Sequence, residues 1–380
     1  MNTRIPSFLS RPVALAAAAL ATALLAAGPA QAAHGVAATA GQTDAAPSSR
    51  PLPVVASFSI LADLVKQVGG DRVAVESLVK AGGDTHVFQP GPAQVRQLSS
   101  ASLVVVNGLG FEGWMPRLIG SSGYKGPVVE AARGLQAMKA TDDHHHHGDD
   151  ADEDDHDHEG PHGHDHDHDG PHGHDHDEDG PHGHSHADHD HDEASHGHHH
   201  HHHGGLDPHA WQDALNVRHY VANIAEGLCQ AAPADCAGFR ERARAYDQKL
   251  LELDQEIHQA VDATPTDRRR VMVSHAAFGY YGRAYHITFM APVGISTEEE
   301  PSASVVANLI RQARQQNVQA FFFENNSDPR LLKRMASELK NVTIGELYAD
   351  SLSPANGPAA DYLSMMRYNT RAITQALSKK

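Results

Sequence analysis

The segment from Asp142 to His203, 62 residues long, constrains the fold of this chain more than any other feature. It holds 25 of the 32 histidines and 21 of the 48 acidic residues, and it contains no lysine or arginine. A ten-residue repeat rich in histidine begins at Gly160, Gly170 and Gly180. Since almost none of these side chains can be buried, the segment cannot offset the conformational entropy lost on ordering. We therefore predict a disordered insertion within a folded chain.

The imidazoles of this insertion predict metal binding. Neutral imidazole is a common ligand of borderline divalent ions, and His-rich tracts are typical of metal-binding segments. A solvated linker does not need 25 imidazoles, and an inserted affinity tag explains the final histidine run but not the repeats. We expect borderline divalent metal ions to bind at His144, His145, His146, His147, His162, His164, His166, His172, His174, His176, His182, His184, His198, His199, His200, His201, His202 and His203.

The folded remainder of the chain carries little net charge. With 380 residues, the chain is long enough for two domains of ordinary size beside the insertion. Its formal charge is −18, but the insertion alone contributes −21, so that the remainder carries +3. Since neither a strongly basic body nor a nucleic-acid-binding motif is present, nucleic acid is not expected as a partner.

The N-terminus predicts export. Two early arginines precede an apolar run over residues 13–27 and the sequence Ala30-Gln31-Ala32, a combination typical of a secretory signal peptide. We expect residues 1–32 to be removed and residues 33–50 to form a disordered lead. No cysteine stands at the cleavage point, and no later run reaches the roughly 18 apolar residues of a membrane helix. The expected product is a soluble exported protein without a lipid anchor.

Cys229 and Cys236 are the two cysteines of the chain. In an exported protein they stand in an oxidising environment. On one continuous helix they would lie about 10 Å apart, which is too far for a disulfide. Pro233 falls between them and is expected to end the first helix, so that a bridge across this corner becomes feasible. We predict the disulfide and keep two free thiols as the alternative.

Buried strands and helices alternate around the insertion. The pattern predicts strands at residues 52–57, 73–79, 103–106 and 128–129 and helices at residues 60–68 and 92–100. The chain resumes at Leu206, where Asp207 is expected to cap a helix that starts near Pro208, with His209 in its first turn. We assign residues 51–141 and 204–234 to an N-terminal α/β lobe.

A single long helix follows. Over residues 235–262, apolar side chains recur at intervals of three and four, which predicts about 27 helical residues and a length of about 40 Å. Residues 263–380 form the C-terminal α/β lobe, with strands expected at 270–273, 287–291, 320–323 and 342–347 and helices at 302–316, 330–339 and 359–377. The predicted fold class is α/β, with two parallel-sheet lobes joined by one long rigid helix.

Four residues stand where such sheets bind ligands, at the carboxyl ends of strands. His86, His275 and Asp350 directly follow predicted strands, and His209 opens a helix just after the insertion. Two of the four come from each lobe. Three imidazoles and one carboxylate in the interlobe cleft would form a closed four-coordinate site suited to Zn²⁺.

Each of these residue types also has an ordinary role. A single loop histidine is more often structural than a ligand, and an aspartate after a strand is more often a turn or capping residue. We assign structural or incidental roles to His34, His219, His258 and His286. Glu324, at the end of a strand, is either a carboxylate that orients a ligand imidazole or a capping or salt-bridge partner.

Six segments resemble one known family. They read GGDTHVFQPGP, NGLGFEGWMPRLI, LDPHAWQDALN, SHAAFGYYGRAYHI, GISTEEEPSAS and DYLSMMRYNT. In this order they are similar to the motifs of the metal-binding solute-binding proteins of zinc and manganese ABC transporters, from about residue 52 to residue 377 apart from the insertion. The resemblance implies two α/β lobes joined by one rigid helix, with the metal held in the cleft.

Matched motif by motif, the first three ligands of that family fall on His86, His209 and His275. Its C-terminal aspartate falls on Asp350, where the surrounding match is looser. Manganese members resemble one another in having a carboxylate at the third position, whereas His275 supplies an imidazole. A His-rich insertion at this point is likewise a feature of zinc members. The resemblance therefore favours Zn²⁺ over Mn²⁺.

The expected function is high-affinity capture of Zn²⁺ in the periplasm and its delivery to the permease of an ATP-driven importer. The protein is expected to be a monomer and not an enzyme, with the insertion acquiring or buffering additional zinc. One alternative is a zinc-sequestering buffer that serves no permease. Another is a zinc hydrolase with Glu324 or Glu112 as its base, although no HExxH motif is present.

Overall fold

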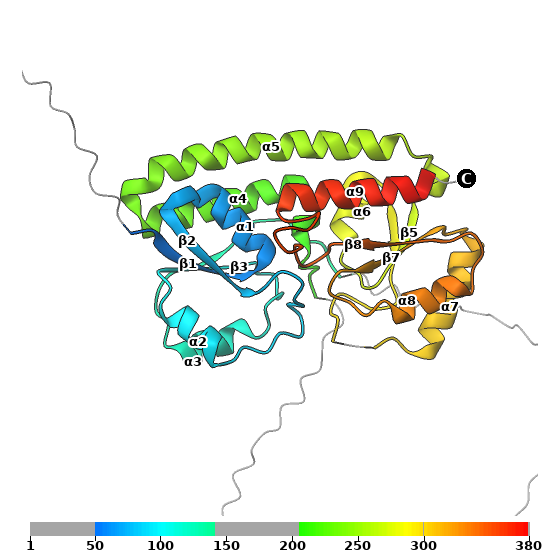
Figure 1. Ribbon diagram of the computed structural model, residues 1–380, viewed down its shortest axis with the longest axis horizontal. Helices are drawn as coiled ribbons and strands as arrows, with labels where there is room; N and C mark the ends of the chain where they lie inside the picture. The colour runs from blue at the N-terminus through cyan, green and yellow to red at the C-terminus, as the bar shows by residue number, and fades with distance from the viewer. Residues whose placement is uncertain (1–49, 141–204, 299, 379–380) are drawn as a thin grey trace, which may run out of the picture. The chain divides into compact units, whose positions relative to one another are not determined.

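The computed structural model describes residues 50–140, 205–298 and 300–378. Within them, two four-stranded sheets form two α/β lobes (Figure 1). The first sheet has the order β2-β1-β3-β4 and the second the order β6-β5-β7-β8, and all strand pairs are parallel. The predicted fold class is confirmed. The predicted signal peptide, the lead up to residue 49 and the His-rich insertion lie outside the described residues.

The first lobe follows the predicted alternation. Its strands are β1 (Leu52–Phe58), β2 (Val73–Val79), β3 (Leu103–Val106) and β4 (Val128–Glu130). Its helices are α1 (Ser59–Gly69), α2 (Pro92–Ser99), α3 (Met115–Ser122) and α4 (Ala214–Ala231), with 3₁₀ turns at Gly70–Arg72 and Ala210–Gln212. All side chains of β3 are buried, as expected for a parallel strand that is covered on both faces.

The second lobe repeats this arrangement. Its strands are β5 (Arg270–Val273), β6 (Thr288–Met290), β7 (Ala320–Glu324) and β8 (Thr343–Leu347). Its helices are α6 (Gly279–Tyr285), α7 (Ala303–Gln315), α8 (Arg330–Ser337) and α9 (Tyr362–Ser378). The sequence pattern does not predict α6, because this seven-residue helix contains two glycines and no apolar repeat of helical spacing.

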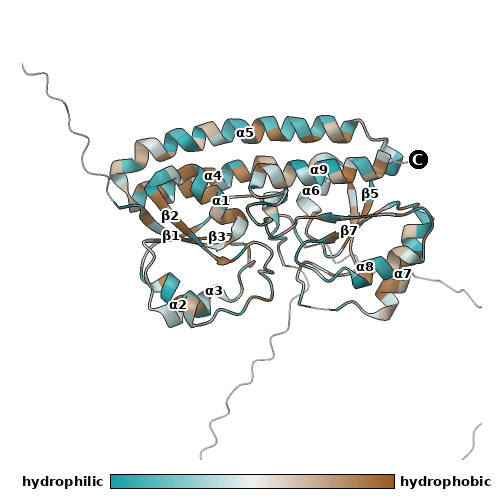
Figure 2. Cartoon of the chain, viewed as in Figure 1, coloured by the Kyte–Doolittle hydropathy of each residue, from teal (hydrophilic) through white to brown (hydrophobic). Residues whose placement is uncertain are grey.

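Helix α5 (Cys236–Asp262) is the long helix that the sequence predicts, and it packs against α1 and α4 of the first lobe and α6 and α9 of the second (Figure 1). Hydrophilic residues occupy much of its outer side in Figure 2. The predicted apolar positions are all buried, namely Phe239, Ala243, Tyr246, Leu250, Leu253, Ile257 and Val261. Because one continuous helix of 27 residues packs on both lobes, it limits how far they can move apart along its axis.

The start of α4 differs from the prediction. Asp213 caps this helix, since its side chain accepts a hydrogen bond from the backbone nitrogen of Leu215. His209 precedes the 3₁₀ turn and does not lie within α4. The predicted capping role of Asp207 is wrong because its carboxylate is engaged by the backbone and ring nitrogens of His209.

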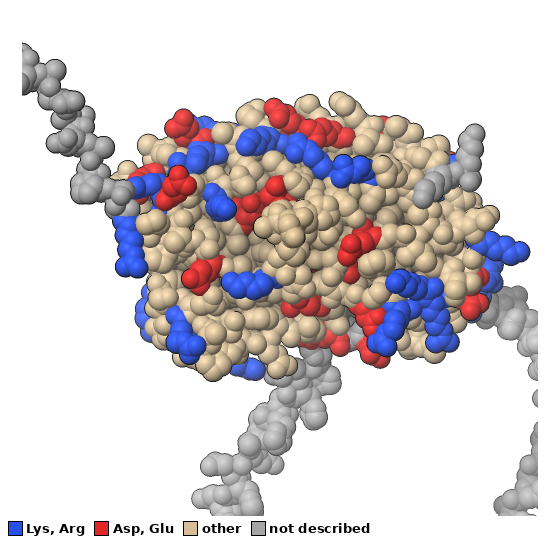
Figure 3. Space-filling model, in the orientation of Figure 1, with Lys and Arg blue, Asp and Glu red and all other residues tan. Residues whose placement is uncertain are grey.

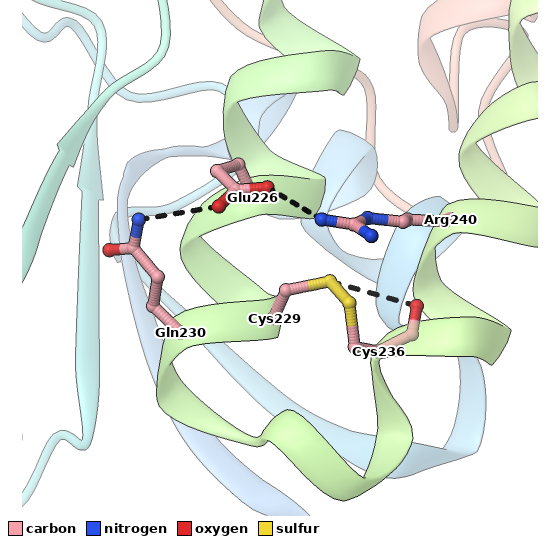
Figure 4. Close-up of a disulfide and its surroundings, with 5 residues drawn as sticks. All are labelled: Glu226, Cys229, Gln230, Cys236 and Arg240. Atoms are coloured by element: carbon pink, nitrogen blue, oxygen red, sulfur yellow. Dashed lines mark hydrogen bonds and ion pairs between the residues drawn. A yellow bond between two sulfur atoms is a disulfide. The ribbon is translucent and has the colours of Figure 1, made fainter.

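A disulfide joins Cys229 near the end of α4 to Cys236 at the start of α5 (Figure 4). The first helix ends before Pro233, as predicted, and a 3₁₀ turn over Pro233–Asp235 reverses the chain. The two Cα atoms are therefore 4.4 Å apart. Beside the bridge, Arg240 of α5 is paired with Glu226 of α4. The predicted bridge is confirmed, and it fixes the corner between the two helices.

Replacing both cysteines by alanine is expected to lower the free energy of unfolding by about 2 to 3 kcal/mol, because the bridge closes a short loop in the unfolded chain. Chemical denaturation of the metal-free protein, followed by circular dichroism, measures this change. A reducing agent should destabilise the wild-type protein by a similar amount and leave the double variant unchanged. Equal denaturation midpoints for wild type and variant would contradict a stabilising bridge.

The surface combines charges of both signs. On the face shown in Figure 3, lysine and arginine side chains are interspersed with aspartate and glutamate. Besides the pair of Arg240 with Glu226, two further ion pairs tie α5 to its neighbours, Arg218 with Asp247 and Arg367 with Glu256, each with a closest distance of 2.6 Å. None of the helices in the described ranges combines the length and apolar character needed to traverse a bilayer.

Candidate metal centre

Four side chains from separate parts of the chain converge between the two lobes. His86 follows β2, His209 precedes the 3₁₀ turn before α4, His275 follows β5 and Asp350 follows β8. One nitrogen or oxygen atom from each lies within 4.8 Å of those of the other three. Within the described ranges, no other group of three or more histidine, cysteine or acidic side chains is arranged in this way.

The carboxylate of Asp350 lies against all three imidazoles. Its oxygens are 3.1 Å from Nε2 of His275, 3.5 Å from Nε2 of His86 and 3.6 Å from Nε2 of His209. The Nε2 atoms of His86 and His209 are 3.3 Å apart. Among the described residues, Nε2 of His275 and both oxygens of Asp350 are buried without a hydrogen-bond partner. Buried polar atoms normally have partners, and a cation bound at this point would supply one.

Two buried carboxylates orient two of the imidazoles. Oε2 of Glu324 lies 2.5 Å from Nδ1 of His275, and Oε1 accepts a hydrogen bond from the backbone nitrogen of the same residue. Oδ1 of Asp207 lies 2.8 Å from Nδ1 of His209. A carboxylate at Nδ1 holds a proton there and leaves Nε2 to coordinate a metal. Glu324 is thus an ion-pair partner of His275, and in this position it also fixes the orientation of the ring.

His86 is held through its backbone. Its nitrogen donates to Oδ1 of Asp84 at 2.9 Å, and Oδ2 of Asp84 accepts from Thr297 of the second lobe at 2.8 Å. The edge of its ring contacts Phe111, with 4.9 Å between ring centroids. At 6% the side chain of His86 is the most exposed of the four, and a hollow of about 610 Å³ lined by His86, Phe111 and Trp114 opens there. Solvent therefore approaches the cluster from the His86 side.

Asp350 is fixed by the opposite lobe. The carbonyl oxygen of its neighbour Ala349 accepts from Nε1 of Trp211 at 2.9 Å. On its other side, the hydroxyl of Ser351 accepts from the backbone nitrogen of Gly82 at 2.6 Å. Both donors belong to the first lobe, whereas Asp350 belongs to the second. The cluster is therefore complete only while the two lobes are in contact.

The charge states of the cluster are coupled. Burial disfavours a charged imidazole at His275, but the carboxylates of Glu324 and Asp350 outweigh burial and raise the pKa of His275 well above the ordinary value. Burial also disfavours a charged Asp350, but His275 and His209 outweigh it and lower the pKa of Asp350 well below its usual range. The metal-free cluster therefore contains an imidazolium beside carboxylates, and an incoming metal ion displaces the proton.

The sequence anticipates the four clustered residues but misses Asp207, which it assigns to a helix cap. An available signal is the Asp-Pro-His spacing, since a carboxylate two residues before a histidine can fold back to its ring. Of the histidines assigned ordinary roles, His219 and His286 are exposed and His258 is partly buried; all three lie outside the cluster. His34 and the auxiliary histidines of the insertion lie outside the described residues.

Comparison of this chain with known protein families identifies the family to which it belongs. Residues 54–376 match the family described as the periplasmic component A of the zinc-uptake complex. This chain belongs to that family. The match covers both lobes and all four clustered residues.

Curated relatives agree with this assignment, and a solved structure has a similar fold. The chain is 26% identical over 331 residues to the metal ABC transporter substrate-binding lipoprotein ScbA of Streptococcus cristatus, covering 87% of this chain and 90% of the relative. It is 26% identical over 344 residues to the manganese ABC transporter substrate-binding lipoprotein PsaA of Streptococcus anginosus, covering 90% and 94%. The fold is similar to that of the periplasmic zinc-binding protein TroA of Treponema pallidum, with a TM-score of 0.67, 23% identity and coverage of 87% and 100%.

Family membership defines the function at a coarse level. The protein is the extracytoplasmic metal-binding component of an ABC transporter, whose partners are a membrane permease and its ATPase. Since the family consists of transport proteins and not of enzymes, the hydrolase alternative is excluded. Of the two catalytic bases considered for a hydrolase, Glu324 is hydrogen-bonded to Nδ1 of His275. Glu112 accepts from Ser57 and from the backbone of Asn107, and burial raises its pKa to about 7 against these donors.

Proposed function

We propose that this protein captures Zn²⁺ in the periplasm and delivers it to the permease of a zinc importer. The proposed ligands are His86, His209, His275 and Asp350. One observation carries the proposal, namely that three imidazoles and one carboxylate converge on one point, with two of the three imidazoles oriented by buried carboxylates.

The separations between these atoms suit zinc. Zn–N and Zn–O bonds of about 2.0 to 2.1 Å in a tetrahedron place neighbouring ligand atoms about 3.3 to 3.4 Å apart. The contacts between Asp350 and the three imidazoles span 3.1 to 3.6 Å, and the nitrogens of His86 and His209 are 3.3 Å apart. The remaining pairs of ligand atoms lie within 4.8 Å, so that a bound zinc ion would draw them closer together.

The donor set favours zinc over manganese. Relatives are named for both metals, TroA for zinc and PsaA for manganese, so that the family alone does not choose between them. Imidazole suits borderline ions such as Zn²⁺, whereas Mn²⁺ prefers carboxylate, carbonyl and water oxygens. At His275 this chain has an imidazole where the manganese members that it resembles have a carboxylate. The nearby carboxylate of Glu324 does not take the place of this imidazole in the cluster, because it contacts Nδ1 of His275, on the side of the ring away from the other ligands.

The His-rich insertion is proposed as a set of weaker auxiliary zinc sites beside the cleft. Its flanks meet in a short antiparallel pairing, in which the backbone nitrogen of Ala140 donates to the carbonyl of Gly205 at 2.8 Å. His209 follows Gly205 by four residues. The two flanks of the insertion therefore meet within a few residues of a proposed ligand.

Several finer features stay predictions. They are cleavage of the signal peptide, the monomeric state and the lobe boundaries. The absence of a lipid anchor is also a prediction, since curated relatives are named lipoproteins. The chain has two cysteines, and both form the disulfide.

Competition titrations with Zn²⁺ and Mn²⁺ test the proposal on the mature protein with and without residues 142–203. We expect one tight zinc equivalent in both forms, additional weaker equivalents only in the full chain, and manganese binding at least roughly 100-fold weaker than zinc. If deleting residues 142–203 removed the tight equivalent, the metal site would lie in the insertion and the assignment of the cleft would be wrong. Equal affinities for the two metals would contradict zinc selectivity.

The alternative of a buffer without a permease needs a transport measurement. Zinc uptake by cells that depend on this protein should stop when the permease is removed, even though the binding protein is still produced. The cleft variants described below should lower uptake together with affinity. Zinc tolerance that depends on the protein but not on the permease would favour the buffer.

A further inference from the structure

Asp207, whose carboxylate orients the ring of His209, is held in place by residues of the opposite lobe. Asp207 precedes α4 in the first lobe, but its main chain contacts the first turn of α6 in the second. The hydroxyl of Tyr280 donates to the carbonyl oxygen of Asp207 at 3.0 Å. The same hydroxyl accepts from the backbone nitrogen of Met138 at 2.9 Å, and Met138 pairs with Asp207 through a further backbone bond. Tyr280 thus fixes the backbone on both sides of this pairing.

Gly279 makes close approach of the Asp207 carboxylate possible. A Cβ atom added at Gly279 would lie 2.7 Å from Oδ2 of Asp207, closer than real Cβ contacts. The carboxylate cannot move aside freely, because its other oxygen is bonded to the backbone nitrogen of His209 at 2.9 Å and lies 2.8 Å from Nδ1. A hollow of about 310 Å³ lined by Met138, Asp207 and Gly279 adjoins this carboxylate, but turning into it would take Oδ1 away from both nitrogens of His209.

We propose that the first turn of α6, through Gly279 and Tyr280, positions His209 for metal binding by holding Asp207 across the lobe interface. Gly279 and Tyr280 are positioning residues, since neither belongs to the metal cluster. The inference rests on the proposed zinc site, to which it adds residues that control the geometry of one ligand.

The same segment also carries a ligand. His275 lies four residues before Gly279, and β5 leads through it into α6. One short stretch of the second lobe therefore supplies one imidazole and orients another that comes from the first lobe. A displacement of this stretch loosens two ligands together, so that the rate of metal release depends on how firmly α6 is seated against Asp207.

Gly279→Ala is the direct test. We expect zinc affinity to fall about 10- to 100-fold, as is typical when a partner of a ligand imidazole is lost, with most of the change in the dissociation rate. The full chain is titrated against a chelator that leaves only the tightest site occupied. The absorption spectrum of the first Co²⁺ equivalent reports whether the coordination geometry has changed. Gly294→Ala is the matched control, because a Cβ there meets nothing within 4 Å.

A double substitution separates positioning from general destabilisation. Asp207→Ala alone should weaken binding by a similar factor, because His209 then loses its carboxylate. With that carboxylate absent, the added Cβ has space, and Gly279→Ala should cause no further loss. Additive losses would overturn the proposal, as would wild-type affinity and spectrum in Gly279→Ala.

Tyr280→Phe keeps the test valid if Gly279→Ala is poorly folded. It removes only the hydroxyl that bridges Met138 and Asp207, and a several-fold loss of affinity is expected. Tyr281→Phe is its control, a fully buried neighbour whose hydroxyl contacts Thr370 instead. Equal affinities for the two tyrosine variants would overturn the inference. A wild-type protein without a tight zinc equivalent would instead refute the proposed function.

Discussion

Replacing His275 by alanine is expected to weaken zinc binding to the cleft about 10²- to 10³-fold, since four ligands share roughly 10 to 16 kcal/mol in structural zinc sites. The metal-free protein is also expected to lose stability. The imidazolium of His275 lies between the buried carboxylates of Glu324 and Asp350, 2.5 and 3.1 Å away. Without this side chain, both carboxylates lose their cationic partner. Breaking a buried ion pair typically costs about 3 to 5 kcal/mol. Chelator competition and thermal unfolding of the metal-free protein measure the two effects.

His219→Ala is the control for this substitution, because His219 is exposed on α4 and lies outside the cluster. It should change neither zinc affinity nor thermal stability. A His275→Ala protein that binds zinc as tightly as wild type would remove His275 from the ligand set. If its affinity fell without a loss of stability in the metal-free form, the ion-pair description of the empty cluster would be wrong.

The fold was largely predictable because its burial is regular. Strands such as β3 and β7 are short apolar runs, and their parallel pairing follows from the helices between them. Helix α5 was predicted almost to its ends, since its seven buried residues repeat with helical spacing. The convergence of His86, His275 and Asp350 follows from topology, because each stands where a strand ends at the same edge of its sheet.

Contacts that depend on how the two lobes meet were not predictable. The role of Asp207 is set by Gly279 and Tyr280, which lie more than 70 residues away in the chain and belong to a short helix without a clear pattern. The local sequence therefore predicts a helix cap at Asp207, which is the common role for an aspartate before a helix. The neighbouring helix had its own cap in Asp213. The preference of aspartate for helix caps holds for Asp213 but not for Asp207.

Lowering the pH from about 7.5 to about 5.5 is expected to weaken zinc binding at the cleft roughly a hundredfold or more, because each ligand imidazole must lose its proton to bind metal. Glu324 and Asp350 raise the pKa of His275 against the opposing effect of burial, so that this residue still holds its proton at neutral pH in the metal-free protein. Zinc displaces that proton, and affinity falls about tenfold for each unit of pH below the raised pKa.

Glu324→Gln separates the contribution of His275 from that of the other imidazoles. Removing one of the two carboxylates that favour the imidazolium lowers the pKa of His275, and the dependence of zinc affinity on pH between about 6.5 and 8 should become shallower. Affinity at the highest pH should also fall, because Nδ1 of His275 loses its orienting partner. Chelator competition at a series of pH values measures both changes. A wild-type affinity that did not change over this range would mean that zinc displaces no proton from the cluster, and the imidazolium assigned to His275 in the metal-free protein would be wrong.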